Sequence, residues 1–264
     1  MALFDVNIDA TCGNARALTF ETAHGTVHTP MFMPVGTHAT VKGVTTPQLR
    51  ELNSQVVLAN TYHLYMRPGV DIIEKAGGVQ KFMNYDGPML TDSGGFQLFS
   101  LDHMMKTDPD GVTFHARDYD GSKHRWTPES NMDIQQRIGA DIVMQLDQCI
   151  GYPSPKEAVA ASTKLSWEWA ERCCAAHTRE DQALFAIVQG GMHRDLRLES
   201  AKRLIEIDAA SRAAGHKGFQ GFGGVAQRSN HFHIALSIYG TRERITQHGL
   251  ILNNHELDHG NSFS

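Results

Sequence analysis

The sequence contains no apolar run long enough to cross a membrane, and its first residues lack the basic segment and apolar core of a secretory signal. We therefore expect a cytoplasmic protein. Cysteine is scarce, and the spacing of Cys12, Cys149, Cys173 and Cys174 fits neither a disulfide framework nor a cysteine metal site. Because Cys173 and Cys174 are neighbours in a helix-like segment, where adjacent side chains diverge, we expect reduced thiols.

A surplus of positive charge is also missing. The formal net charge is −5, which argues against a protein wrapped broadly in nucleic acid but allows a local basic patch. With 264 residues, of which 41% are apolar, the chain can bury the core of one large α/β domain. Barrels of this size commonly remain undivided.

What the sequence does contain is a repeated junction between an apolar run and a polar or glycine group. Residues 88–97 read Pro-Met-Leu-Thr-Asp-Ser-Gly-Gly-Phe-Gln, so an apolar run leads directly into Asp92 and Ser93. A single junction of this kind is more often only a turn. Three later apolar runs end in the same way, at Asp147, at Gln189-Gly190-Gly191 and at Gly223-Gly224. Parallel strands would gather these groups at one edge of a sheet, where ligands bind.

Six apolar runs alternate with helix-like segments. We expect strands at residues 31–36, 56–60, 89–90, 141–146, 184–188 and 218–222, and helices from residue 46 and over 71–76, 128–138, 156–177 and 194–207. Residues 7–30 predict a β-hairpin cap, and residues 112–126 predict a hairpin around Asp120-Gly121. The alternation predicts a parallel sheet in an incomplete TIM-like (β/α)8 barrel, with about six of its eight units recognisable.

The character of the chain changes after Ala226. The segment 227–264 contains two short apolar runs and the histidines His231, His233, His248, His255 and His259. His255 and His259 could share a helix face and bind a metal, but nothing else there has ligand spacing, so we favour a solvated tail. The apolar runs could also supply two short strands that close the sheet. We therefore divide the chain into a partial barrel, 1–226, and an atypical tail, 227–264.

The residue types at the expected pocket suit the edge of a purine. A carboxylate accepts from two neighbouring N–H donors, which guanine presents, while a glutamine amide and a glycine N–H can donate to a carbonyl beside them. Asp147, Gln189 and Gly224 could thus read a purine edge, and glycine leaves room for the ligand. Phe96 and Tyr62 could stack on the base or belong to a packed barrel rim.

Several motifs of this chain occur together, and in the same order, in one known family. They are residues 30–37, Asn60-Thr61-Tyr62-His63-Leu64, Arg67-Pro68-Gly69, residues 91–97, residues 141–147 with Tyr152-Pro153, Val188-Gln189-Gly190 and Gly223-Gly224-Val225-Ala226. Up to about Ala226 the chain resembles tRNA-guanine transglycosylase, the queuine tRNA-ribosyltransferase of the bacterial type. The resemblance implies a transferase of TIM-barrel fold that acts in tRNA processing and queuosine biosynthesis. It would replace guanine at the tRNA wobble position by a 7-deazaguanine, preQ1 or queuine.

The resemblance also implies roles for individual residues. Asp92 would be the general acid and base, and the purine would be held by Ser93, Phe96, Asp147, Cys149, Gln189, Gly223 and Gly224. The target base would have to leave its stack to reach them. The implied partners are tRNA and the guanine or 7-deazaguanine base, and the resemblance allows a homodimer.

Two features of the family are not found in these 264 residues. The family's attacking aspartate lies in an Asp-Cys-Val-x-Pro-Thr-Arg-like motif that is absent, and Asp258, the only aspartate after Ala226, stands in a different context. The family's zinc ligands, a Cys-x-Cys-x-x-Cys run and a histidine, are also missing, since no cysteine follows Cys174. Two hypotheses follow: a pentosyltransferase of this family whose chain is shortened or altered at its C-terminal end but keeps the base pocket, or a non-catalytic purine-binding or tRNA-binding protein that could pair with a complete partner.

Overall fold

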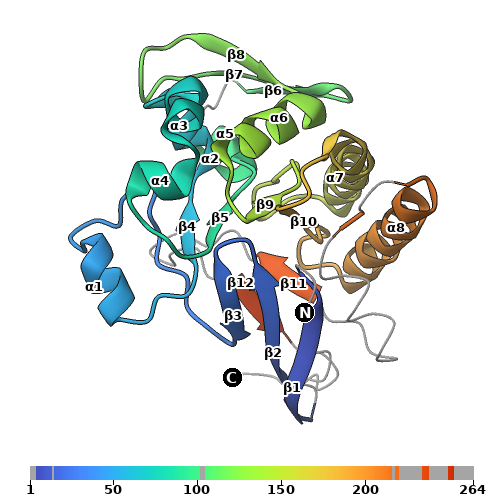
Figure 1. Cartoon of the computed structure of the whole chain (residues 1–264). Helices are drawn as coiled ribbons and strands as arrows, with labels where there is room; N and C mark the ends of the chain where they lie inside the picture. The colour runs from blue at the N-terminus through green and yellow to red at the C-terminus, as the bar shows by residue number, and fades with distance from the viewer. Residues whose placement is uncertain are drawn as a thin grey trace, which may run out of the picture.

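A parallel sheet forms the centre of the computed structural model, which describes residues 4–13, 15–101, 105–215 and 218–219, and the backbone of 234–237 and 249–252. Its strands are β4 (Val57–Ala59), β5 (Met89–Thr91), β9 (Ile142–Met144) and β10 (Ala183–Phe185), in the order β10-β9-β5-β4 (Figure 1). All pairs are parallel. The second to fifth predicted strands are therefore confirmed.

The first and sixth predicted strands differ from expectation. Residues 31–36 form only a parallel bridge, in which Gly36 N donates to Leu58 O at 2.6 Å and Leu58 N donates to Pro34 O at 3.0 Å. Pro30 and Pro34 have no N–H group, which limits any longer ladder. Of the predicted sixth strand, 218–222, only Gly218 and Phe219 are described, and neither lies in a strand. The described fold is α/β with a parallel sheet.

Eight helices in the described part of the chain connect and cover these strands. They are α1 (Thr46–Glu51), α2 (Thr61–Met66), α3 (Val70–Ala76), α4 (Val79–Met83), α5 (Gly95–Leu101), α6 (Pro128–Ile138), α7 (Lys156–Ala176) and α8 (Arg194–Ala213). The predicted helices are confirmed, although α8 continues beyond the expected residue 207. Helices α2, α4 and α5 were not predicted. Helices of fewer than two turns are too short for a periodic apolar pattern.

Antiparallel sheets lie at two ends of the molecule (Figure 1). Where a hairpin cap was predicted, β1 (Val6–Cys12), β2 (Ala15–Thr22) and β3 (Gly25–Thr29) form a three-stranded sheet. At the opposite end lie β6 (Lys106–Asp108), β7 (Gly111–His115) and β8 (Lys123–Trp126), so the second predicted hairpin is β7–β8. In the tail, β11 (Ile234–Ser237) and β12 (Gly249–Leu252) pair with each other in a sheet of their own, which differs from the expected closure of the parallel sheet.

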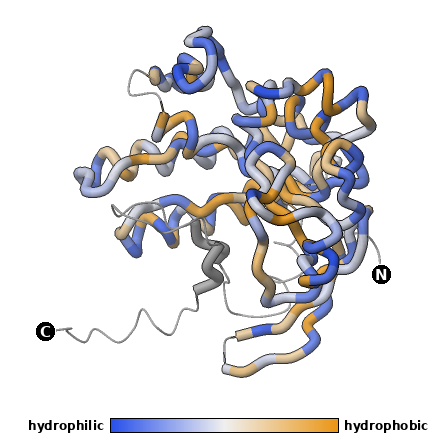
Figure 2. The backbone as a smooth tube through the Cα atoms, turned by 90° about the vertical axis from the view of Figure 1, so that its left-hand side faces the viewer, coloured by the Kyte–Doolittle hydropathy of each residue, from blue (hydrophilic) through white to orange (hydrophobic). Residues whose placement is uncertain are grey.

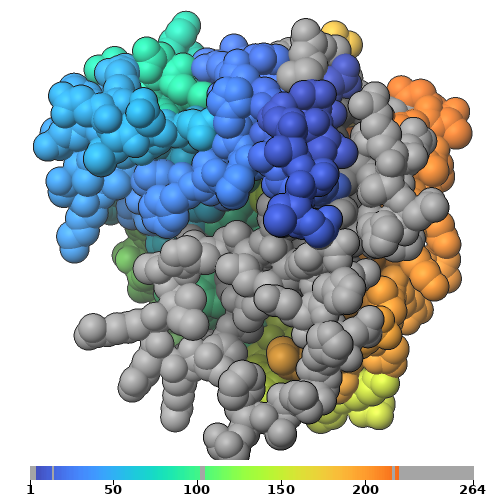
Figure 3. All heavy atoms as spheres, turned by 90° about the horizontal axis from the view of Figure 1, so that it is seen from below, coloured from blue at the N-terminus to red at the C-terminus, as the bar shows by residue number. Residues whose placement is uncertain are grey.

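The two faces of the parallel sheet pack against different elements. Residues of one face, such as Val143, are buried with the helices in a cluster that contains Trp169 of α7. The other face packs with the amino-terminal sheet, as Leu90 does in a cluster with Val27 of β3. Figure 2 shows the apolar segments gathered at the centre. Seen from below in Figure 3, the amino-terminal strands lie beside the segment that contains α1.

Hydrogen bonds to a buried carboxylate connect the amino-terminal sheet to the parallel sheet. Asp141, 1% exposed, accepts hydrogen bonds from His24 N at 3.2 Å and His24 Nδ1 at 2.8 Å. It also accepts from Gln80 Nε2 and Met89 N, both at 2.9 Å. One carboxylate just before β9 thus joins the β2–β3 turn, α4 and the start of β5.

We expect Asp141→Asn to destabilise the protein. In the variant, the N–H groups of the asparagine amide would face N–H groups that donate to the carboxylate in the parent. Breaking a buried charged network costs about 2–4 kcal/mol of unfolding free energy, which urea denaturation would measure. Asp86→Asn is the matched control, because Asp86 is an exposed partner of Arg50 at 2.8 Å. An equal loss in both variants would contradict the role assigned to Asp141.

Candidate active site at the carboxyl ends of the strands

Asp92 stands directly after β5 and receives hydrogen bonds from the segment after the neighbouring strand. Asn60 Nδ2 donates to one carboxylate oxygen, and Thr61 N donates to the other at 3.0 Å. Gly94 N also donates to that second oxygen, at 3.1 Å. Gly94 has a φ of +77°, and a Cβ there would lie 2.7 Å from the Trp126 ring, so this turn requires glycine.

Asp92 is partly buried, and its surroundings shift the pKa of its carboxyl group. Burial raises its pKa to about 6, against the opposing effect of hydrogen bonds from Thr61, Asn60, Gly94 and Gln97. Desolvation of the charged form outweighs four donors here. A carboxyl group with a pKa near neutrality can both release and accept a proton at physiological pH. The site therefore contains a group suited to general acid and base catalysis.

Asp147, which follows β9, is 4% exposed, and its carboxylate accepts from the side chains of three residues. Ser93 Oγ donates to one oxygen at 3.0 Å, and Gln189 Nε2 donates to the other at 2.6 Å. Cys149 Sγ also lies 3.7 Å from that second oxygen. Burial raises the pKa of Asp147, while Gln189 and Ser93 oppose the rise.

Cys149 is a thiol rather than a thiolate in this arrangement. Burial, followed by the charge and hydrogen bond of Asp147, raises the pKa of Cys149 well above its ordinary value. A nucleophilic cysteine requires the opposite shift. Cys149 is thus a small apolar wall residue beside Asp147.

Buried polar groups of α6 hold the two strands of the site in place. Asn131 Nδ2 donates to Ser93 O at 2.8 Å, and Gln135 Nε2 donates to Met144 O at 2.8 Å. Gln135 Oε1 also accepts from Thr91 Oγ1 at 3.0 Å. These contacts tie β5 and β9 to one helix. The sequence analysis missed Asn131 and Gln135, although polar residues four apart on the apolar side of a helix are an available signal.

Close approach at Gly95 brings the two halves of the site together. A Cβ on Gly95 would lie 2.8 Å from both the backbone oxygen and Oδ1 of Asp147. Gly95 N donates to Ser93 Oγ at 3.2 Å. Any side chain at this position would push Asp147 away from Ser93.

Most of the predicted site residues converge. Contacts join Ser93, Asp147, Cys149 and Gln189, and Asp92 is the chain neighbour of Ser93. Phe96 lies in α5 and is partly buried, while Gly223 and Gly224 lie outside the described residues. Asn60 and Thr61, which bond Asp92, were quoted in a motif but given no role.

Tyr62 belongs to the packed rim, which was one of its two predicted alternatives. It is 1% exposed, and its ring centroid lies 5.8 Å from that of Phe114 and 6.4 Å from that of Trp126. A ring enclosed in this way offers no open face to a base.

In the described part of the chain, no three His, Cys, Asp or Glu side chains gather as metal ligands would. The described residues thus offer no site that fits the family's zinc. The histidines of the tail lie outside the described residues. No described helix is both long and apolar enough to span a membrane.

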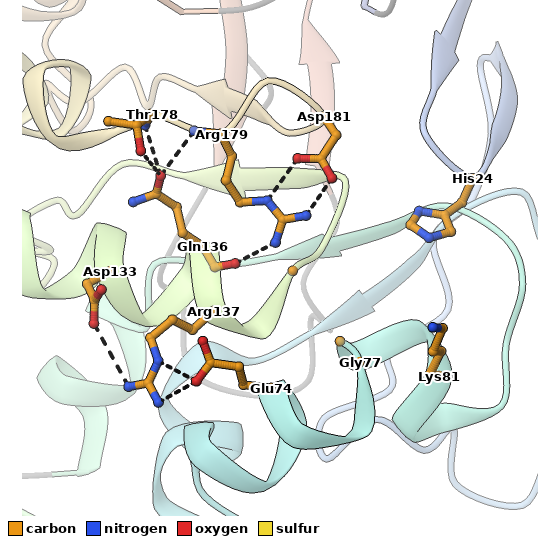
Figure 4. Close-up of a pocket in the computed structure, with 12 residues that line it drawn as sticks. His24, Glu74, Gly77, Lys81, Asp133, Gln136, Arg137, Thr178, Arg179 and Asp181 are labelled. Carbon is orange, nitrogen blue, oxygen red and sulfur yellow. Dashed lines mark hydrogen bonds and ion pairs between the residues drawn. The ribbon is translucent and has the colours of Figure 1, made fainter.

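A hollow of about 600 Å³ opens at the other ends of the strands (Figure 4). Its lining includes Gly139 and Asp181, which precede β9 and β10. Its arginines already have carboxylate partners: Arg137 lies 2.7 Å from Glu74, and Arg179 lies 2.5 Å from Asp181. The candidate active site is therefore the one at the carboxyl ends, where Asp92 and Asp147 lie.

Comparison with known proteins now identifies the family. The family model described as queuine tRNA-ribosyltransferase matches residues 10–232. The chain belongs to this family. The resemblance found in its motifs is thereby confirmed.

Curated relatives agree with this assignment. The queuine tRNA-ribosyltransferase of Desulforamulus reducens is 54% identical over 194 residues, which cover 74% of this chain and 52% of the relative. Those of Ruminiclostridium cellulolyticum and Synechococcus elongatus are 50% and 49% identical over 218 residues. These matches cover 81% of this chain and 58% and 56% of the two relatives. The chain spans about half the length of the relatives it matches.

Asp92→Asn tests how much the raised pKa of Asp92 contributes to the pH dependence of the unfolding free energy. The unfolded chain has an ordinary Asp pKa of 3.8, whereas burial holds the pKa of Asp92 at about 6 in the folded protein. The folded state binds the proton more tightly, so the free energy of unfolding falls as the pH rises from about 4 to about 6. We expect this contribution to be about 1–3 kcal/mol and to be missing in the variant.

Urea denaturation between pH 4 and pH 7 would measure both proteins. Asp86→Asn is the control and should keep the parental decline across this window, because hydrogen bonding to Arg50 lowers the pKa of the exposed Asp86. The assignment fails if Asp92→Asn follows the parental curve throughout.

Proposed function

We propose that this chain carries the base pocket of a tRNA-guanine transglycosylase, a pentosyltransferase that replaces guanine at the tRNA wobble position by a 7-deazaguanine such as preQ1 or queuine. This activity would belong to queuosine biosynthesis, and the tRNA substrate would place the protein in the cytoplasm. The observation that carries the proposal is the pair of carboxyl groups at neighbouring strand ends. Asp147 is buried and held by exchangeable side-chain donors, and Asp92 has a pKa of about 6.

Asp147 would read the base. Its two oxygens can accept from the adjacent N1–H and 2-amino groups of guanine. Gln189 Nε2, which now donates to Asp147 at 2.6 Å, would turn to the purine carbonyl when the base enters. Ser93 and Cys149 would line the same pocket, Phe96 would stack on the base, and Gly223 and Gly224 would supply backbone groups. The position of Asp147 between Ser93 and Gln189 supports this assignment.

Asp92 would manage the protons of the exchange. In its acid form it would protonate the purine that leaves the ribose, and in its base form it would accept a proton from the purine that enters. Its pKa of about 6 supports both roles near neutral pH.

The covalent step requires another group. Exchange at one sugar carbon with retained configuration proceeds through a nucleophile such as a second carboxylate. The family's nucleophile motif does not occur in these 264 residues, and we assign that role to neither Asp147 nor Asp258. A second candidate function, a non-catalytic purine-binding or tRNA-binding subunit, would need no such group.

For the fold, we propose a TIM-like barrel. The parallel bridge at Val35 and strands β4, β5, β9 and β10 follow each other in the sheet in chain order. Residues 1–226 would form the partial barrel and residues 227–264 the atypical tail.

Guanine binding tests the proposed pocket directly. We expect isothermal titration calorimetry to detect guanine binding to the 264-residue chain, and Asp147→Asn to weaken it by about 100-fold, because an amide cannot accept both N–H groups. Adenine is the ligand control, since it has neither the N1–H nor the 2-amino group. Equal affinities of the parent and Asp147→Asn for guanine would contradict the pocket.

Incorporation of labelled guanine into tRNA separates the two candidate functions. We expect little or no turnover by this chain alone, because loss of a nucleophile lowers covalent catalysis by several orders of magnitude. Robust turnover that Asp92→Ala abolishes would contradict this expectation and establish the chain as an enzyme by itself.

A further inference from the structure

The β7–β8 hairpin makes side-chain contacts along the short helix α2. Tyr62 Oη donates to Asp118 Oδ1, and His63 Nδ1 lies 2.8 Å from Tyr119 Oη. One turn further along, Tyr65 Oη lies 3.1 Å from His124 Nδ1 of β8. Three side chains of one six-residue helix are therefore bonded to the same hairpin.

The same helix begins with the groups that hold Asp92. Thr61 N donates to Asp92 Oδ1 at 3.0 Å, and Thr61 Oγ1 donates to Asp92 O at 2.5 Å. Asn60, the residue that caps α2, donates to Asp92 Oδ2. The contacts to the hairpin begin at the next residue, Tyr62. Any shift of α2 against the hairpin therefore moves two donors of the Asp92 carboxylate.

A second path leads from the hairpin to Asp92. Trp126, the last residue of β8, packs against Gly94 so closely that a Cβ on Gly94 would lie 2.7 Å from its ring. Gly94 N is a further donor to Asp92. The hairpin thus contacts α2 and the turn that follows Asp92.

Tyr119 links the hairpin to two other segments of the chain. Its phenol oxygen lies 2.9 Å from His38 Nε2 and 2.8 Å from His63 Nδ1, so it joins the segment after Val35 to α2. Burial and the charge of Asp118 raise the pKa of Tyr119, while Arg67, 5.7 Å from the ring centroid, opposes the rise. Burial and His38 lower the pKa of His63. A protonated phenol between two imidazoles can donate to one ring and accept from the other.

We propose that the β7–β8 hairpin positions the Asp92 carboxylate through α2, and that Tyr119 is the positioning residue. The inference rests on the proposed function only for the proton-transfer role of Asp92, because the contacts are independent of it. Tyr119 touches neither Asp92 nor the purine pocket residues by any contact described above. It acts through His63 and the amino-terminal residues of α2.

Tyr119→Phe tests this role with the smallest change. The ring remains beside Arg67, and only the oxygen shared by His38 and His63 is lost. Because Thr61 N and Asn60 lower the pKa of Asp92, a looser α2 should raise it. We expect ¹³C NMR of the labelled aspartate carboxyls to show Asp92 titrating at higher pH than in the parent. We also expect the Thr61 amide hydrogen to exchange about tenfold faster. Tyr62→Phe, which breaks the contact with Asp118, should shift both signals in the same direction.

Tyr85→Phe is the matched control. It removes one phenol oxygen, which donates to Ser54 O at 2.5 Å, away from the hairpin. It should leave the Asp92 titration and the Thr61 amide exchange unchanged. The proposal is overturned if Tyr119→Phe leaves both signals at their parental values, or if Tyr85→Phe changes them equally. Neither measurement requires base exchange, so both test the positioning role even if the chain has no activity on tRNA.

Discussion

The site depends on two carboxyl groups at adjacent strand ends, of which Asp147 is buried and Asp92 is partly buried. Each carboxylate loses water, and donors from a neighbouring strand must replace it. Parallel register supplies those donors, because Ala59 pairs with Thr91, which brings Asn60 level with Asp92. Asp92 N donates to Ala59 O at 3.2 Å and extends this register into the site. A slip of one residue would turn these side chains to opposite faces of the sheet.

Buried carboxylates lie at both ends of the parallel sheet, Asp141 before β9 and Asp147 after it. The groups that donate hydrogen bonds to them differ in type. Asp141 accepts from the backbone N–H groups of His24 and Met89, which cannot leave without unfolding the segments they belong to. Asp147 accepts from the side chains of Ser93, Gln189 and Cys149, besides a hydrogen bond within its own residue. Side chains can rotate away and give their place to a ligand. The buried carboxylate before β9 thus binds backbone groups that stay in place, whereas the one after β9 accepts from side chains whose place a ligand can take.

The sequence predicted those parts whose signal is local. Apolar runs predicted β4, β5, β9 and β10, and long amphipathic segments predicted α6, α7 and α8. Two differences between prediction and structure have a physical cause. The first predicted strand forms only a bridge because proline lacks an N–H donor, and α2 was not predicted because it is too short to show a helical period. The function of Asn60 and Thr61 could not be read locally, because it depends on the register between β4 and β5. Asp147 could be found because the carboxylate and the strand before it are adjacent in sequence.

The residues proposed to hold the base can be described without the nucleophile, whose family motif does not occur in these 264 residues. Asp92, Asp147 and Gln189 follow three strands that are neighbours in the sheet. Groups that read the purine bind it in the ground state and the transition state alike. Binding of that kind lowers the concentration of base required but does not by itself accelerate the bond exchange. Positioning of Asp92 by the hairpin can accelerate the reaction only in a protein that also supplies the second carboxylate.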